Sequence, residues 1–305
     1  TVEKSVKLGM IEDGTKYFHI ISKDKAGNTG KKATHYKFNV DTQALQPVIN
    51  SKTHQDQTSW YNNTTVEIHV SKPYDLSGIA GFYYLVNKIP DYEPVETELT
   101  WTEQTEIIIK EKADGTWYVH VKSKDLAGNV SRGTSHFRFN IDTQALPPNV
   151  SSVTHPDSQK WYNVKRAQFK ISPPEDLSGI SGYFYVIDNN DKTIPDEKSL
   201  WIDKDTIFSG DLKDGTWYLH VISKDRAGNV GRQASHFKFN IDTVAKPPVV
   251  YSVTHKDTEE WYKNSIPQIQ WDTPDDISGI EGYYYTIDQK NFTVPQKDNS
   301  EWTIS

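Results

Sequence analysis

Hydrophobic and polar residues alternate along many short stretches of this 305-residue chain. In the stretch TWYVHVKSK, Trp117, Val119 and Val121 fall on one face of an extended strand. His120 and Lys122 fall on the opposite face. A period of two is typical of half-buried antiparallel strands, so we expect the apolar face to join a core and the polar face to meet solvent.

A second alternating stretch, HFRFNID, follows at residues 136–142. Between the two stretches, the sequence DLAGN places Gly128 and Asn129 where a tight turn with a positive-φ residue is expected. The pattern therefore predicts a β-hairpin. The core residues expected from it are Trp117, Val121, Phe139 and Ile141.

Further strands are predicted upstream of each hairpin. In one unit they include VSSVTH, AQFKI, SGYFYVID and a weaker stretch near 206–208. Clusters of Pro, Gly, Asn and Asp separate them, and no long segment shows the 3.6-residue period of a helix. About six or seven short strands per unit predict a β-sandwich.

The whole pattern is repeated along the chain. The segment DGTWYVHVKSKDLAGNVS begins at Asp114, and near-copies begin at Asp13 and Asp214. A spacing of about 100 residues is enough for each unit to own a core. The predicted fold class is therefore all-β, a tandem array of β-sandwiches.

Proline-containing linkers mark the unit boundaries, in the sequences DTQALQP, DTQALPP and DTVAKPP. Proline cannot join a central ladder and holds its neighbour extended, so boundaries are expected near Pro47, Pro147 and Pro247. The predicted organisation is a C-terminal half-repeat at 1–47, complete repeats at 48–147 and 148–247, and an N-terminal half-repeat at 248–305.

Half of a sandwich exposes strand edges and apolar side chains. Two explanations for the half-repeats stay open. The chain is a window on a longer array, or the halves complete each other between molecules and build a filament head to tail.

The segment from Asp114 to Ser131, followed by HFRFNIDTQALPP, resembles the last two strands of fibronectin type III-like and bacterial immunoglobulin-like modules. In those families a strand and turn of the form aromatic-x-V-x-V-x-A/S-x-D-x-A-G-N leads into a final strand ending D-T-x-A-P. The resemblance covers all repeats, although its sharpest motifs occupy the second half of each. It implies extracellular modules on a microbial surface, acting as spacers, fibres or adhesins, with neighbouring repeats or copies of the protein as partners.

Composition narrows the function classes. A net charge of −7 argues against nucleic-acid and anionic-membrane partners, and no run of eighteen apolar residues predicts a membrane span. The chain has no cysteine, which removes disulfides and thiolate chemistry. It also lacks a Gly-rich phosphate loop, HExxH and G-x-S-x-G, so we expect no enzyme.

Acidic loops form the candidate metal sites. In a sandwich of this type, the exit strand of one repeat arrives at the pole where two loops of the next repeat meet. Carboxylates gathered there suit Ca²⁺, which takes roughly six to eight oxygen ligands in flexible geometry. The alternative is that these Asp residues cap turns through their own backbone amides. The candidate ligands are Asp41, Asp75, Asp125 and Asn129 at one junction, and Asp142, Asp176, Asp225 and Asn229 at the next.

Two aromatic features have a functional and a structural interpretation. His120 and His136 project from the predicted outer face beside Lys122 and Arg138, which favours a solvated polar face over a two-histidine metal site. A Trp-Tyr pair beside Asn begins at Trp60 and recurs at 161 and 261, which allows stacking on surface glycans. Packing into the sandwich core is the favoured interpretation of these tryptophans.

Overall fold

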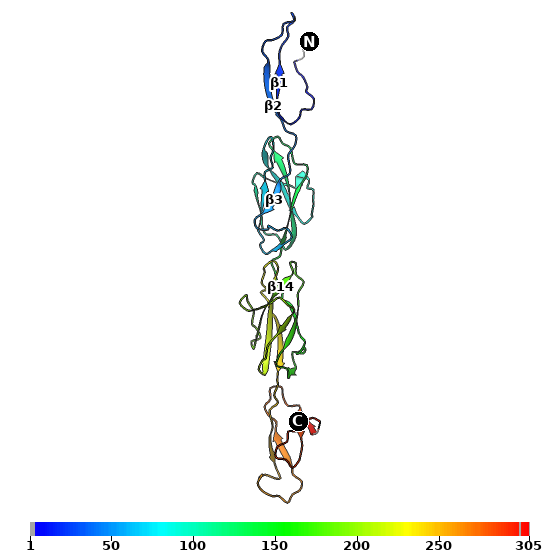
Figure 1. Cartoon of the computed structure of the whole chain (residues 1–305), viewed down its shortest axis with the longest axis vertical. Helices are drawn as coiled ribbons and strands as arrows, with labels where there is room; N and C mark the ends of the chain where they lie inside the picture. Colours follow the sequence, from blue (N-terminus) through cyan, green and yellow to red (C-terminus); the bar gives the residue numbers. More distant parts are fainter. Residues whose placement is uncertain (1–3, 299, 305) are drawn as a thin grey trace. The chain divides into compact units, whose positions relative to one another are not determined.

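The computed structural model describes residues 4–298 and 300–304, and it divides into two compact units. The first unit is Thr1–Gln144 with Arg226–Asn229, and the second is Ala145–Asp225 with Val230–Ser305. Each unit contains one complete β-sandwich and the strands of one further repeat (Figure 1). The outermost residues of the two predicted half-repeats, 1–3 and 305, lie outside the described residues.

The first unit begins with a hairpin of β1 and β2 and continues into a sandwich. Its sheets have the strand orders β4-β10-β9-β6-β7 and β3-β5-β8. A short 3₁₀ helix spans Glu96–Glu98. The strands are β1 (Gly14–Ile20), β2 (Thr34–Val40), β3 (Val48–Ser51), β4 (Trp60–Tyr61), β5 (Val66–Ser71), β6 (Ile79–Asn87), β7 (Thr100–Thr102), β8 (Glu106–Ile109), β9 (Gly115–Asp125) and β10 (Ser135–Ile141).

The second unit repeats this sandwich, with the strand orders β12-β18-β17-β14-β15 and β11-β13-β16. Two more pairs, β19 with β20 and β21 with β22, follow it. The strands are β11 (Asn149–Ser152), β12 (Trp161–Tyr162), β13 (Gln168–Ser172), β14 (Ile180–Asp188), β15 (Leu200–Ile202), β16 (Thr206–Phe208), β17 (Gly215–Asp225), β18 (Ser235–Ile241), β19 (Val249–Ser252), β20 (Ile269–Asp272), β21 (Gly282–Tyr285) and β22 (Glu301–Ile304).

The predicted hairpin is confirmed as the antiparallel pair β9–β10, in which Val119 faces Phe137 and Trp117 faces Phe139. Its turn contains Gly128 at φ 99°, a conformation that favours glycine. Strand β4 pairs with β10 in parallel, which closes the edge of the five-stranded sheet beside the hairpin.

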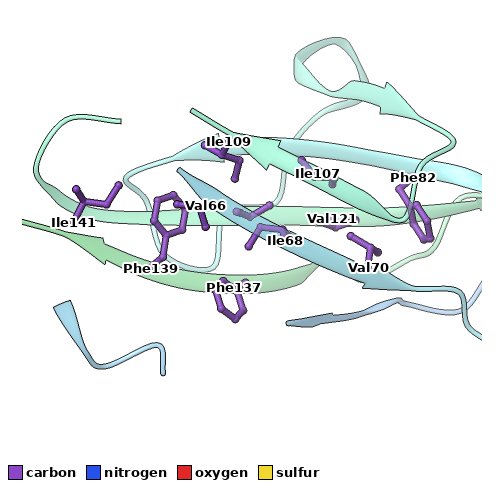
Figure 2. Packing of buried hydrophobic residues seen from close by; sticks show 11 residues of the cluster. Val66, Ile68, Val70, Phe82, Ile107, Ile109, Val121, Phe137, Phe139 and Ile141 are labelled. Carbon is purple, nitrogen blue, oxygen red and sulfur yellow. The ribbon is translucent and has the colours of Figure 1, made fainter. Parts of the chain in front are cut away.

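The apolar core of the first sandwich lies between its two sheets (Figure 2). Val121, Phe139 and Ile141 are fully buried there, as the alternation predicted. Trp117 is only half-buried and packs against the edge of the cluster, where its indole N–H donates to the Ala113 carbonyl at 2.8 Å. The second sandwich has an equivalent core centred on Phe169 and Phe239.

The repeats outside the two sandwiches leave apolar side chains uncovered. Between β19–β20 and β21–β22 a groove of about 700 Å³ is lined by Val250, Ile269, Trp271 and Tyr283, among others. Val250 is 58% exposed and Ile269 is 47% exposed. In the complete sandwich of the same unit, the residue at the position of Ile269, Phe169, is fully buried.

Candidate functional site

Three carboxylates of the first unit converge at one point. Asp41 directly follows β2, Asp75 lies in the loop between β5 and β6, and Asp125 is the last residue of β9. One oxygen from each lies within 4.8 Å of the others. The structure therefore brings together the first predicted set of acidic ligands, within a single unit.

Two of these carboxylates also cap their own turns. Asp125 accepts hydrogen bonds from the backbone N–H and from Nδ2 of Asn129, both at 2.7 Å. Asp75 Oδ1 accepts from the N–H groups of Ser77 at 3.1 Å and Gly78 at 2.9 Å. The turn-capping alternative is thus present in the structure, and it places the oxygens rather than excluding a cation, because a carboxylate offers about four lone-pair sites.

Asp41 accepts hydrogen bonds from residues of the next repeat. Its Oδ2 accepts the N–H of Ser77 at 2.9 Å, and its backbone carbonyl accepts Nδ2 of Asn129 at 3.0 Å. The hydrogen bonds from Ser77 lower the pKa of Asp41 below its usual range, although partial burial opposes them. Asn129 therefore uses its amide nitrogen to bridge the cluster.

The donor set suits a hard cation. All three converging groups are carboxylates, which are the oxygen ligands that Ca²⁺ prefers, and none is a nitrogen or sulfur donor. Three carboxylates at this separation repel one another unless a positive charge lies between them. The residues present are thus compatible with calcium.

The second predicted set divides between the two units. Asp142 belongs to the first unit, where its carbonyl accepts Nδ2 of Asn229 at 2.8 Å. Asp176 and Asp225 belong to the second unit, where Asp176 Oδ1 accepts the N–H of Gly179 at 2.8 Å. This set repeats the sequence of the first and stays a prediction.

A related acidic pair was not anticipated as part of a site. Asp242, directly after β18, lies close to Asp276 of the following loop, within the second unit. The backbone N–H of Lys246 also donates to Asp276 at 3.3 Å. The positions match Asp41 and Asp75 after two repeats, so the repeat spacing carried this signal.

The linker that leaves Asp41 is bound by the repeat that follows. Ser123 Oγ donates to the carbonyl of Leu45, and Ser135 Oγ donates to the carbonyl of Pro47 at 2.6 Å. The side chains of Ala44 and Pro47 are buried. The two serines were not recognised as linker contacts from the sequence, because their alternation only assigns them to a face of the sheet.

The expectation of a solvated histidine face is wrong for His120. This residue is fully buried, and its Nδ1 lies 2.7 Å from Nδ1 of the half-buried His136 on the neighbouring strand. Outward residues of β9 are covered because the segment from 88 to 95 folds over them, bringing Tyr92 within 5.9 Å of the His120 ring. The nitrogen separation is that of a hydrogen bond.

The Trp-Tyr motifs lie at sheet edges. Trp60 and Trp161 begin the two-residue strands β4 and β12 and are half-buried, whereas Trp261 is fully exposed. The Tyr61 ring packs at a tilt against the buried His54, with ring centroids 4.5 Å apart, which supports the packing interpretation over a glycan platform.

No helix in the described residues has the length and apolar composition needed to cross a bilayer.

Comparison with known proteins gives similarity at the level of structure. No protein-family model and no curated protein matches the chain. One similar solved structure is the Ca²⁺-stabilised adhesin that helps an Antarctic bacterium reach out and bind ice. It is 17% identical with a TM-score of 0.37, and the match covers 79% of this chain and 60% of the adhesin structure.

Two other similar structures are multi-domain segments. The fibronectin(III)-like modules of Clostridium thermocellum CbhA are 10% identical over 66% of this chain and 90% of theirs, with a TM-score of 0.26. Domains of titin are 10% identical over 75% of this chain and 89% of theirs, with a TM-score of 0.36. The strand order of this chain itself confirms the predicted class, tandem β-sandwich repeats of the immunoglobulin and fibronectin III type.

Proposed function

We propose that this chain is part of an extended extracellular protein of a microbial surface, in which tandem β-sandwiches act as spacers. The observation that carries the proposal is the bound linker of the first unit. Ser123, Ser135 and Asn129 hold the carbonyls of Leu45, Pro47 and Asp41. A linker bound along its length restricts bending, so each added repeat extends the reach of the array rather than folding back on it.

Small-angle scattering tests the spacer role. Removal of residues 148–247 deletes one repeat and joins two linkers of the same pattern. The longest strand has 11 residues, so one repeat is about 35 Å long before its loops are counted, at roughly 3.3 Å per residue. We expect the maximum dimension to fall by at least that length. An unchanged maximum dimension would contradict the spacer proposal.

We further propose that calcium binds at the repeat junctions. Asp41, Asp75 and Asp125 would supply carboxylate oxygens at the first junction, with Asn129 holding the cluster in place. The sequence repeat extends the proposal to Asp142, Asp176, Asp225 and Asn229. The ion would neutralise the converging charges and stiffen the junction.

Thermal unfolding with and without chelator tests the calcium proposal. Calcium in large excess over its Kd is expected to raise the Tm of the first unit by several degrees, since ligand at about 100 times Kd adds about 2.7 kcal/mol. Asp125→Asn should remove part of that shift. Asp24→Asn is the matched control, because Asp24 accepts from Asn28 the same two hydrogen bonds that Asp125 accepts from Asn129, but lies outside the cluster. A Tm unchanged by chelator would exclude a stabilising ion.

A self-assembling filament is the second candidate function. The groove lined by Val250 and Ile269 lies where a complete repeat buries its last hairpin, and residues 14–40 form such a hairpin with Phe18 and Phe38 on an open apolar face. In the complete sandwich, the equivalent positions belong to one fully packed core. One molecule would thus bind the β1–β2 hairpin of the next.

Light scattering across a concentration series tests this candidate. We expect the mass of the 305-residue chain to rise with concentration, and Phe38→Asp to keep it monomeric. Met10→Asp is the control, because Met10 is fully exposed and lies outside the apolar face. A constant monomer mass for the unaltered chain would rule the filament out.

A further inference from the structure

Each complete repeat contains a pair of histidines in direct contact on its central hairpin. His120 of β9 faces His136 of β10 with their Nδ1 atoms 2.7 Å apart, and His220 of β17 faces His236 of β18 at 2.6 Å. His120 and His220 are fully buried. Only one proton fits between two nitrogens at this distance, so one ring donates and the other accepts.

The other ring nitrogen of the buried histidine fixes which ring accepts. His120 Nε2 lies 2.9 Å from Asn87 Oδ1. That oxygen also accepts the backbone N–H of Ile89 at 2.8 Å, which establishes it as the amide oxygen rather than the nitrogen. His120 must therefore carry its proton on Nε2 when neutral. Its Nδ1 then accepts the Nδ1–H of His136.

The two repeats differ at the residue that contacts this Nε2. Asn87 is replaced in the second repeat by Asp188, whose Oδ1 lies 3.2 Å from His220 Nε2. The Asp188 carboxylate is fixed by Thr193 Oγ1 at 2.6 Å and by the N–H of Asn190 at 2.9 Å. Burial raises the pKa of Asp188, but hydrogen bonds from these residues and from His220 together outweigh it and hold the pKa below its usual value. A negative charge thus lies against His220, and a neutral amide against His120.

The remaining charged and titratable groups around the pairs do not remove this contrast. The groups near the first pair are Asp91, Glu93, Tyr92 and Tyr118. Glu93 also forms an ion pair with Lys122 at 3.3 Å. The groups near the second pair, besides Asp188, are Asp191 and Tyr218. Burial, reinforced by His136, lowers the pKa of His120 even though Asp91 and Glu93 oppose the shift.

Protonation of both rings of a pair has different consequences in the two repeats. Once both rings are protonated, both Nδ1 atoms carry hydrogen and the N–H···N contact cannot persist. A charged His220 would still form an ion pair with Asp188. A charged His120 would be buried against Asn87 without direct compensation, which is unfavourable in a low-dielectric site.

We propose that the residue at positions 87 and 188 sets the acid response of each repeat, so that mild acid opens the His220–His236 contact, where Asp188 stabilises the added charge, while the His120–His136 contact persists to lower pH. The device is independent of calcium and of the spacer role. It makes the second complete repeat the first to respond to acid, through β17 and β18.

Histidine side-chain NMR of the 305-residue chain between pH 8 and 4.5 tests the proposal, with signals assigned by single His→Gln variants. We expect the His120–His136 pair to take up protons at a lower pH than the other pair, because only the other pair contacts an opposite charge. Asn87→Asp should raise the first midpoint to that of the second. Asp188→Asn should lower the second. Both substitutions preserve side-chain shape and the acceptor oxygen.

Gln104→Glu is the control, since it adds one negative charge to the exposed surface of the same sandwich away from the pair. Its midpoint should match that of the unaltered chain. Amide exchange at pH 5 should be faster in β17 than in β9, and Asp188→Asn should slow it. Equal midpoints in the two repeats, or an Asn87→Asp variant that behaves like Gln104→Glu, would overturn the proposal.

Discussion

Single buried histidines make both sandwiches sensitive to acid, independently of the histidine pairs. His54 and His155 are fully buried, and each ring lies edge-on against a core phenylalanine, Phe139 or Phe239. Burial disfavours the charged ring and lowers the pKa of both histidines. The unfolded chain therefore binds more protons than the folded chain below a pH of about 6.5, the ordinary value for histidine.

We expect the free energy of unfolding to be constant above about pH 7 and to fall as the pH decreases through about 6.5, because the folded state must keep these rings neutral. Urea unfolding at pH 7.5, 6.5 and 5.5 measures this slope before most carboxylates titrate. His54→Gln should make the slope shallower, whereas the exposed His19→Gln should not. A slope that is the same in both variants would contradict the assignment.

At the scale of residues, alternation predicted the buried Val121, Phe139 and Ile141. The expected sandwich topology placed Asp41, Asp75 and Asp125 at one pole, and their carboxylates do converge, although calcium binding there stays a prediction. Alternation placed His120 outside, because it assigns a residue to a face of one sheet and does not show which loop covers that face. That information depends on the fold of residues 88–95, which have no periodic pattern.

At the scale of elements, edge strand β7 packs its tryptophan against a glycine of the neighbouring strand. Gly81 in β6 lies under the indole of Trp101 in β7, and a Cβ added there would lie 2.6 Å from the Trp101 ring and from the carbonyl of Thr102. The glycine allows the tryptophan of a three-residue edge strand to pack flat on the sheet. Equivalent contacts occur at Gly182 and Gly282.

Gly81→Ala is expected to destabilise the first sandwich by about 1–3 kcal/mol, since overpacking must displace either the indole or the β7 backbone. Chemical unfolding of the variant gives the loss directly. Gly9→Ala provides the comparison, because a Cβ at Gly9 meets no atom within 4 Å. A variant as stable as the unaltered chain would show that β7 is not fixed by this contact.

Strands within an alternating stretch were predictable, and two short edge strands were not. The hairpin β9–β10 and strands β13, β14 and β16 follow the alternation predicted for them. Strands β4 and β7 have two and three residues, too few to show a period. Their pairing depends on packing against β10 and β6, which local sequence does not encode.

At the scale of the whole molecule, the linker of the first unit is bound by the repeat that follows it. In the first unit, the backbone of the Asp41–Pro47 linker is held at both ends and at Leu45 by side chains of the next sandwich. Thermolysin should therefore cleave this linker slowly, although the Leu45 side chain is 55% exposed.

The double variant Ser123→Ala, Ser135→Ala should speed cleavage between Asp41 and Pro47 several-fold, because two linker carbonyls lose their donors. Mass spectrometry of the fragments identifies the cut. Ser59→Ala, which removes a hydroxyl bonded to Asp56 in a surface turn, should leave the rate unchanged. Rapid cleavage of the unaltered linker would show that these hydrogen bonds do not protect it.

The bound linker also bears on how such a protein changes length over evolutionary time. A block that starts at Asp41 and ends with β10 carries both the linker and the serine and asparagine groups that hold it. Unequal recombination between near-identical gene segments adds or removes whole blocks, and every new boundary then joins a linker to a matching receptor. Copy number can vary without any compensating mutation, which leaves selection free to act on reach alone.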